Sequence, residues 1–170
     1  SNILEVYTHF VTTADAMKDN LTREQWDQAE ILWERLDTRK NELEKDMDQI
    51  AKFLVAQGIK AIKFCPFDKV GVRNRGEYIS NKEIDECLLW IKQVKDAVGD
   101  ELEIGCEFHS IWNLPSAVRI AKALEPHRVL FLEDMMLQDN MQAYVSLNQE
   151  TSIPLVISER LATRFGFREM

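Results

Sequence analysis

The stretch that decides the fold is Leu102–Phe108 (LEIGCEF), an apolar, strand-like run with a glutamate, Glu107, near its end. The same arrangement returns 26 residues later at Glu133 and after a further 26 residues at Glu159, each shortly beyond another apolar run. A carboxylate at the end of each strand in a regular strand–helix repeat is typical of a parallel barrel that carries a metal site on one face. The spacing therefore predicts that the three carboxylates gather at one mouth of such a barrel.

The rest of the chain alternates strand-like and helix-like segments. Capping boxes at Thr22 and Ser80 and a glycine at Gly58 mark helix ends. Besides the strands that lead to the glutamates, the pattern predicts strands over Leu4–Phe10 and Ala61–Phe64, a loop over Asp68–Tyr78, and helices over Thr22–Gly58, Ser80–Val98, Pro115–Leu124 and Asn140–Gln149, with a last helix after Glu159.

Strands that alternate with helices imply parallel pairing and right-handed crossovers, so the predicted class is α/β. We count five βα units, whereas a closed barrel needs eight in roughly 250 residues. The prediction for residues 1–170 is therefore a partial (β/α) barrel that lacks the last three units. Because an open half-barrel exposes strand edges, we expect a piece of a longer enzyme or a half-barrel that pairs. An open doubly wound sheet is the alternative fold.

Composition excludes some classes of function. The net charge of −8, from 21 basic and 29 acidic residues, argues against a nucleic-acid binder, which needs a basic face. No apolar run approaches the roughly 20 residues that span a bilayer, so no membrane partner is expected. The three cysteines show no CxxC spacing, which favours a reducing, cytoplasmic location.

The three glutamates offer only oxygen donors. Such a set favours a hard cation, Mg²⁺ above all, with water or substrate at the remaining positions. The alternative is three solvated carboxylates, each paired with a nearby lysine or arginine.

Two further residues are candidates for acid–base chemistry. His109 follows Glu107 by two residues, so on a strand both side chains would face the same way, and an imidazole can transfer protons near neutral pH. The alternative is a hydrogen-bonded histidine without chemistry. Lys63, inside the apolar run AIKF, can polarise a substrate carboxylate, or act as a base if its pKa is depressed. A structural pairing with Glu107 or Glu133 is equally compatible. Asp134 should face away from Glu133 and serve a supporting or capping role.

At these residues the sequence resembles the mandelate racemase and enolase superfamily, in particular its branch of sugar-acid dehydratases (mannonate and galactonate dehydratase-like proteins). The segments that carry the resemblance are Gly58–Pro66 (GIKAIKFCP), Glu107–Pro115 (EFHSIWNLP), Ala121–Pro126 (AKALEP), Leu130–Asp134 (LFLED) and Ile153–Arg164 (IPLVISERLATR). The resemblance implies that Glu107, Glu133 and Glu159 bind Mg²⁺, which holds the substrate carboxylate and stabilises an enediolate after loss of the α-proton. It also implies that His109 assists departure of the β-hydroxyl, giving a 2-keto-3-deoxy sugar acid. A homo-oligomer is expected.

The sequence departs from the family pattern in three ways. The first ligand is Glu107 where these dehydratases usually have aspartate, and Lys63-x-Cys65 stands where many members have a Lys-x-Lys pair. The family's capping domain and its last three strands, with a His–Asp dyad, have no counterpart in this sequence, so we expect the isolated chain not to turn over substrate.

Two other functions remain open. One is a non-catalytic relative that acts as a regulator or assembly partner, and the other is an acidic helical interaction module around residues 22–56. Residues 11–40 form either a lid or a helix for oligomer packing through Trp26 and Trp33.

Overall fold

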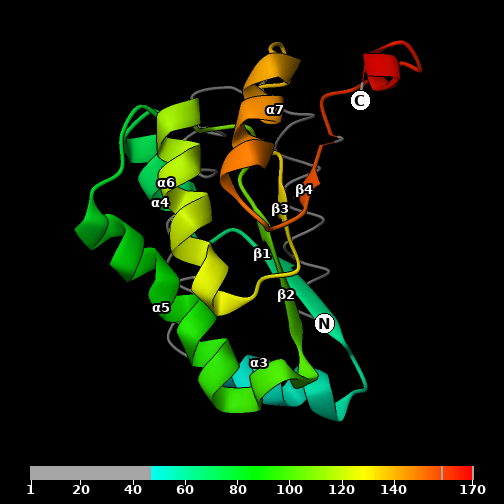
Figure 1. Cartoon of the computed structure of the whole chain (residues 1–170). Helices are drawn as coiled ribbons and strands as arrows, with labels where there is room; N and C mark the ends of the chain where they lie inside the picture. Colours follow the sequence, from blue (N-terminus) through cyan, green and yellow to red (C-terminus); the bar gives the residue numbers. More distant parts are fainter. Residues whose placement is uncertain (1–46, 158, 170) are drawn as a thin grey trace, which may run out of the picture. The chain divides into compact units, whose positions relative to one another are not determined.

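The computed structural model describes residues 47–157 and 159–169, which belong to one compact unit (Figure 1). Its centre is a parallel sheet of four strands, β1 (Ala61–Phe64), β2 (Glu103–Glu107), β3 (Phe131–Glu133) and β4 (Leu155–Val156). The strands pair in the order β1-β2-β3-β4, so neighbours along the chain are neighbours in the sheet. This order is that of successive barrel strands. The order therefore confirms the predicted parallel α/β class. In a doubly wound sheet the strand order reverses direction at one point, and the four described strands show no such reversal.

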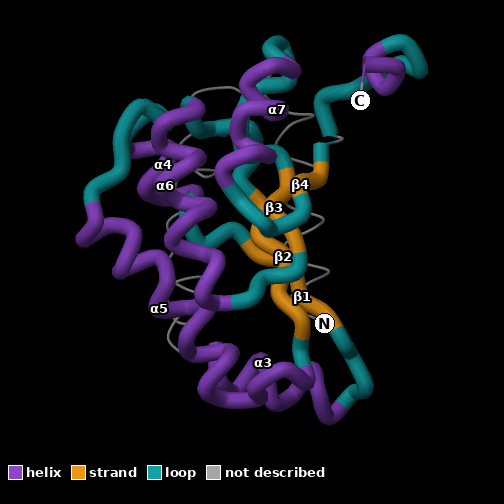
Figure 2. Tube along the Cα trace, in the orientation of Figure 1, coloured by secondary structure: helices purple, strands orange, loops and turns teal. Residues whose placement is uncertain are grey.

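Helices connect the strands. They are α3 (Met47–Ala56), α4 (Asp68–Arg73), α5 (Asn81–Val98), α6 (Leu114–Leu124) and α7 (Met141–Glu150), with short 3₁₀ helices η1 (Gly99–Glu101), η2 (Glu125–His127) and η3 (Gly166–Glu169). Figure 2 shows α5 and α6 on the same side of the strands, as crossovers of one hand require. Among the described helices, none is both long enough and apolar enough to cross a membrane.

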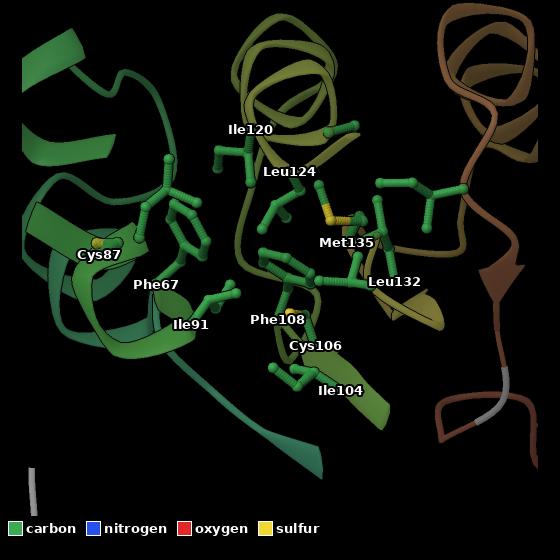
Figure 3. Close-up of a cluster of buried hydrophobic side chains, with 14 of the residues drawn as sticks. Phe67, Cys87, Ile91, Ile104, Cys106, Phe108, Ile120, Leu124, Leu132 and Met135 are labelled. Atoms are coloured by element: carbon green, nitrogen blue, oxygen red, sulfur yellow. The ribbon is translucent and has the colours of Figure 1, made fainter. Parts of the chain in front are cut away.

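The core lies between the sheet and these helices. Apolar side chains from β2, β3, α5 and α6 interdigitate there and are almost fully buried (Figure 3), among them Ile91, Ile104, Ile120, Leu124 and Leu132. This burial of one face of each element is what stabilises the layers against the chain's conformational entropy.

Local sequence signals set the helix ends. The Ser80 hydroxyl accepts a hydrogen bond from the Glu83 backbone N–H at 3.2 Å, and Glu83 accepts one from the Ser80 N–H at 2.7 Å. This is the capping box that the sequence predicts, and its side-chain and backbone hydrogen bonds lower the pKa of Glu83 to about 2. Asn113 caps α6 by a single hydrogen bond, which its side-chain oxygen accepts from the Ser116 N–H at 3.0 Å.

Two predicted elements are wrong. The segment predicted as a loop over Asp68–Tyr78 begins with the helix α4. Because Gly71 has no side chain, this helix can pack against Ile111 and Trp112 so closely that a Cβ would lie 2.9 Å from the Ile111 side chain. After Glu159 the described residues form only the 3₁₀ helix η3, whose surroundings leave Phe165 and Phe167 exposed, so no apolar face is buried to stabilise an α-helix. The predicted strand Leu4–Phe10, the start of the long helix and residues 11–40 lie outside the described residues.

Gly76 joins the loop after α4 to the segment that precedes α6. Its φ is +66°, its N–H donates to Gly71 O at 2.9 Å, and its carbonyl accepts the Asn113 N–H at 2.9 Å. A Cβ at this position would lie 1.8 Å from the backbone oxygen of Ile111. Gly58 has a similar φ of +79°, but a Cβ there would meet nothing within 4 Å.

We predict that Gly76→Ala destabilises the chain far more than Gly58→Ala. Both substitutions place alanine in the left-handed region, at a cost of about 1–2 kcal/mol. Only Gly76→Ala adds a backbone clash, which should cost roughly a further 1–3 kcal/mol. Urea denaturation of the two variants and the parent chain measures the difference, and equal midpoints for the two variants would contradict the packing described around Gly76.

Candidate metal and acid–base site

The strand register brings two of the three predicted glutamates side by side. Glu107 and Glu133 are the last residues of β2 and β3, and their Cα atoms are partners in the parallel ladder. Glu159 lies three residues beyond the end of β4, whose Val156 is the ladder partner of Glu133. Neighbouring parallel strands end at the same edge of a sheet, so all three residues are at its carboxyl-terminal edge.

Lys63 on β1 holds the first two carboxylates together. Its Nζ donates to Glu107 Oε2 at 2.8 Å and to Glu133 Oε2 at 2.7 Å. The other oxygen of Glu107 accepts the backbone N–H groups of Phe108 and His109 at 3.0 and 3.1 Å. The Glu107 and Glu133 side chains are largely buried, whereas that of Lys63 is 43% exposed. Two carboxylate oxygens thus converge on one positive charge that solvent can reach.

The pKa shifts follow from this arrangement. Burial opposes the charge on Lys63, but hydrogen bonds and Coulomb attraction from Glu107 and Glu133 outweigh it and raise the Lys63 pKa. Burial likewise opposes ionisation of Glu107, and the bonds from Lys63 and the two backbone N–H groups overcome it and lower the Glu107 pKa. A general base at Lys63 would need a depressed pKa. The arrangement therefore supports Lys63 as a cation, both as a binder of carboxylates and as the structural partner that the sequence allowed.

The structure does not bring Glu159 into the same cluster. Its side chain is 41% exposed, with Oε1 3.7 Å from Arg160 Nε. In the part of the chain that the structure describes, the carboxylate oxygens of Glu107, Glu133 and Glu159 do not all lie within 4.8 Å of one another. Asp134 fixes the backbone here, since its buried carboxylate accepts the Glu159 N–H at 3.2 Å. This is the supporting role expected for Asp134, and the metal role of the three glutamates stays a prediction.

His109 pairs with an aspartate that sequence reasoning did not single out. His109 Nδ1 lies 2.8 Å from Asp68 Oδ2, and the imidazole is 46% exposed. The argument from strand alternation does not reach His109, because β2 ends at Glu107 and His109 adopts a φ of +50°. The position of Asp68, shortly after the end of the neighbouring strand β1, is a signal that could have identified it.

Aromatic packing fixes this pair. Phe67 and Phe108 are fully buried, with ring centroids 5.6 Å apart (Figure 3). Each ring immediately precedes one member of the pair, Asp68 or His109. The contact between the rings therefore places the carboxylate and the imidazole next to each other.

The loops after β2 and β3 are bonded to each other in strained conformations. His109, Ser110 and Asp134 all have positive φ, at +50°, +59° and +46°. The Ser110 N–H donates to the Asp134 carbonyl at 2.6 Å, and Trp112 N–H donates to the Met135 carbonyl at 3.1 Å. Such strain in non-glycine residues persists where the surroundings enforce it, and it is concentrated at functional sites.

Several known proteins are similar to this chain in sequence and in fold. The chain is 32% identical over 119 residues to a D-galactonate dehydratase from Klebsiella pneumoniae, covering 68% of this chain and 31% of that protein. Its structure resembles an enolase of the mandelate racemase subgroup from Agrobacterium tumefaciens, with a TM-score of 0.71 and 36% identity over 72% of this chain and 34% of the other. A mandelate racemase/muconate lactonizing enzyme-like protein from Rubrobacter xylanophilus is similar too, with a TM-score of 0.64 and 32% identity over 72% and 32% of the two chains.

The chain spans about a third of the length of these relatives. The part of the fold that they share confirms the predicted partial barrel. Residues 45–170, which include every residue of the candidate site, match the model of the enolase C-terminal domain-like family. The chain therefore belongs to the enolase C-terminal domain-like family, within the superfamily of enolase and mandelate racemase.

Proposed function

We propose that this chain supplies the metal-binding and acid–base edge of a Mg²⁺-dependent dehydratase of sugar acids. The observation that carries the proposal is the convergence of Glu107 and Glu133, from neighbouring strand ends, on one positive charge at 2.8 and 2.7 Å. The similarity to a D-galactonate dehydratase supports the reaction type. The match covers only 31% of that dehydratase, so the complete reaction is proposed for the full-length product of the gene.

The donor set fits a hard cation. Glu107 and Glu133 offer carboxylate oxygens, and Glu159 can supply a third if its exposed side chain turns away from Arg160. When bound, the cation would hold the substrate carboxylate and offset the negative charge that develops as the α-proton leaves. The Lys63 ammonium already bonds to the carboxylates of Glu107 and Glu133. The ammonium and the bound cation would therefore share these two carboxylates.

His109 and Asp68 would handle the leaving group. The Asp68 carboxylate, 2.8 Å from Nδ1, orients the imidazole and leaves Nε2 as the nitrogen that can give a proton to a departing β-hydroxyl. Lys63, which carries a positive charge and is partly exposed, is suited to bind the substrate carboxylate.

A non-catalytic relative is the second candidate function. Cys65 lies two residues after Lys63, where many superfamily members have a second lysine, and a thiol cannot replace a lysine base. A protein of this kind would keep the cation site and act in regulation or assembly.

The first prediction concerns metal binding. Calorimetric titration of the 170-residue chain with Mg²⁺ should show binding that weakens at least about 10-fold in Glu133→Gln and in Glu159→Gln, because each removes a ligand charge. Glu150→Gln, which alters a surface carboxylate paired with Lys122, is the control and should bind as the parent does. Binding that is unchanged by the first two substitutions would overturn the proposed cation site.

The second prediction concerns Lys63. Lys63→Met leaves two adjacent carboxylates without their shared cation, so it should lower the free energy of unfolding at neutral pH by about 1–2 kcal/mol, less than for a fully buried pair because Lys63 is partly exposed. The pKa of Glu107 is lower in the folded parent than its ordinary value of 4.5. The ionised carboxylate therefore stabilises the folded state at pH values above about 4.5, and this stabilisation is lost as the pH falls below that value. The deficit should therefore shrink as the pH falls below about 4.5 and as Mg²⁺ is added.

Thermal melts of Lys63→Met at several pH values, with and without Mg²⁺, measure this effect. Lys122→Met, which breaks an exposed pair with Glu150, is the matched control and should change the melting temperature little at any pH. A deficit in Lys63→Met that is independent of both pH and Mg²⁺ would contradict the shared electrostatic role.

The third prediction concerns turnover. The full-length product of the gene, assayed against a panel of sugar acids with Mg²⁺, should release a 2-keto-3-deoxy acid. His109→Asn should lower kcat by about 10²–10⁴-fold and KM little, the usual effect of losing a general acid. His127→Asn, a histidine in η2, should leave both constants unchanged. Absence of activity against every sugar acid would favour the non-catalytic relative instead.

A further inference from the structure

We propose that Cys65, Asp68 and His109 form a second metal site, one for a divalent ion of the zinc class. Among the residues that the structure describes, these three make up the group of histidine, cysteine and acidic side chains whose ligand atoms all lie within 4.8 Å of one another. None of the three is a glutamate of the proposed Mg²⁺ site. The site is therefore distinct in its ligands, although it lies at the same edge of the sheet.

The donor atoms decide which ion fits. One sulfur, one imidazole nitrogen and one carboxylate oxygen suit Zn²⁺ or Co²⁺, whereas Mg²⁺ prefers six oxygens in an octahedron. Three protein ligands with an open fourth position are the pattern of zinc sites that bind water or another molecule. Zinc bonds of about 2.0–2.3 Å would hold the ligand atoms roughly 3.3–3.7 Å apart, so small side-chain rotations are enough to close the group.

The backbone already brings the ligands together. Cys65 lies on the short connection from β1 to α4 and Asp68 is the first residue of α4, and the Asp68 N–H donates to the Cys65 carbonyl at 3.5 Å. His109 lies just beyond β2, the neighbour of β1 in the sheet. The buried contact between Phe67 and Phe108 ties these two segments together directly beside two of the ligands. Because that contact does not depend on an ion, little reorganisation is needed for binding.

The protons balance without any further reagent. Binding requires that Cys65 release its thiol proton to solvent, since the thiolate is the ligand. His109 binds as neutral imidazole with its proton on Nε2, so a proton on Nδ1 passes to Nε2 or to solvent and the ion takes the place of the hydrogen bond that joins Nδ1 to Asp68. No bond is oxidised or reduced.

The other two cysteines cannot substitute for Cys65. Cys87 and Cys106 are buried in the core, and burial raises the pKa of each to about 12, so both remain thiols at neutral pH. Cys65 is half-buried and His109 is exposed, which gives an ion a route from solvent. If His109 and Asp68 serve the proposed dehydratase, zinc at this site removes them from that reaction and inhibits it.

The experiment is a titration of the chelator-stripped 170-residue chain with Co²⁺. We expect an intense thiolate-to-cobalt absorption band and the visible bands of four-coordinate cobalt, both abolished when Zn²⁺ is added and unaffected by Mg²⁺. Cys65→Ala should lose the thiolate band and bind Zn²⁺ at least about 100-fold more weakly, since even an outer partner of a ligand contributes 10–100-fold. Cys87→Ala is the matched control and should keep the band.

Further variants keep the outcome decisive. Asp68→Asn, which preserves the shape of the side chain, should weaken Zn²⁺ binding with circular dichroism unchanged, so the site is tested even if Cys65→Ala folds poorly. Glu133→Gln should keep the cobalt–thiolate band while losing Mg²⁺ affinity, which separates this site from the proposed function. The proposal is overturned if the parent shows no thiolate band, or if Cys65→Ala and Asp68→Asn bind Zn²⁺ as the parent does.

Discussion

Two carboxylates that end neighbouring parallel strands in register repel each other, and the site depends on how that repulsion is offset. Glu107 and Glu133 are ladder partners, so the fold itself forces their charges together. The Lys63 ammonium from the next strand bonds to both. The three side chains therefore form a unit whose single positive charge offsets only one of its two negative charges, and any added cation must share the oxygens with a lysine. Affinity for a cation and stability of the strand ends are consequently coupled.

The sequence predicted the elements that local chemistry determines. The strand Ala61–Phe64 and the capping box at Ser80 follow from apolar runs and cap residues, and the structure confirms both. The adjacency of Glu107 and Glu133 was also predictable, because parallel strands in sequential order end at one edge. The family resemblance is confirmed by the match over residues 45–170. These features need no knowledge of side-chain conformation.

The features that sequence reasoning missed depend on tertiary contacts. The helix α4 packs closely against Ile111 and Trp112 at Gly71, and this contact between distant residues is not visible along the chain. Asp68 lies beside His109 where the tilted rings of the preceding residues, Phe67 and Phe108, are in contact. The direction of the Glu159 side chain depends on its own torsions and on Arg160. The periodicity of a sequence predicts which helix or strand a residue belongs to. The position of its functional group also depends on the side-chain torsion angles, which the periodicity does not predict.

The sequential order of the strands has a consequence for how the protein is made. Each of the strands β2, β3 and β4 pairs with the strand that immediately precedes it along the chain, so none of these three pairings waits for a segment that is synthesised much later. Structure of this kind can grow from the ribosome one strand–helix unit at a time. During synthesis, Lys63 emerges before either glutamate, so the positive charge is in place when each negative charge arrives.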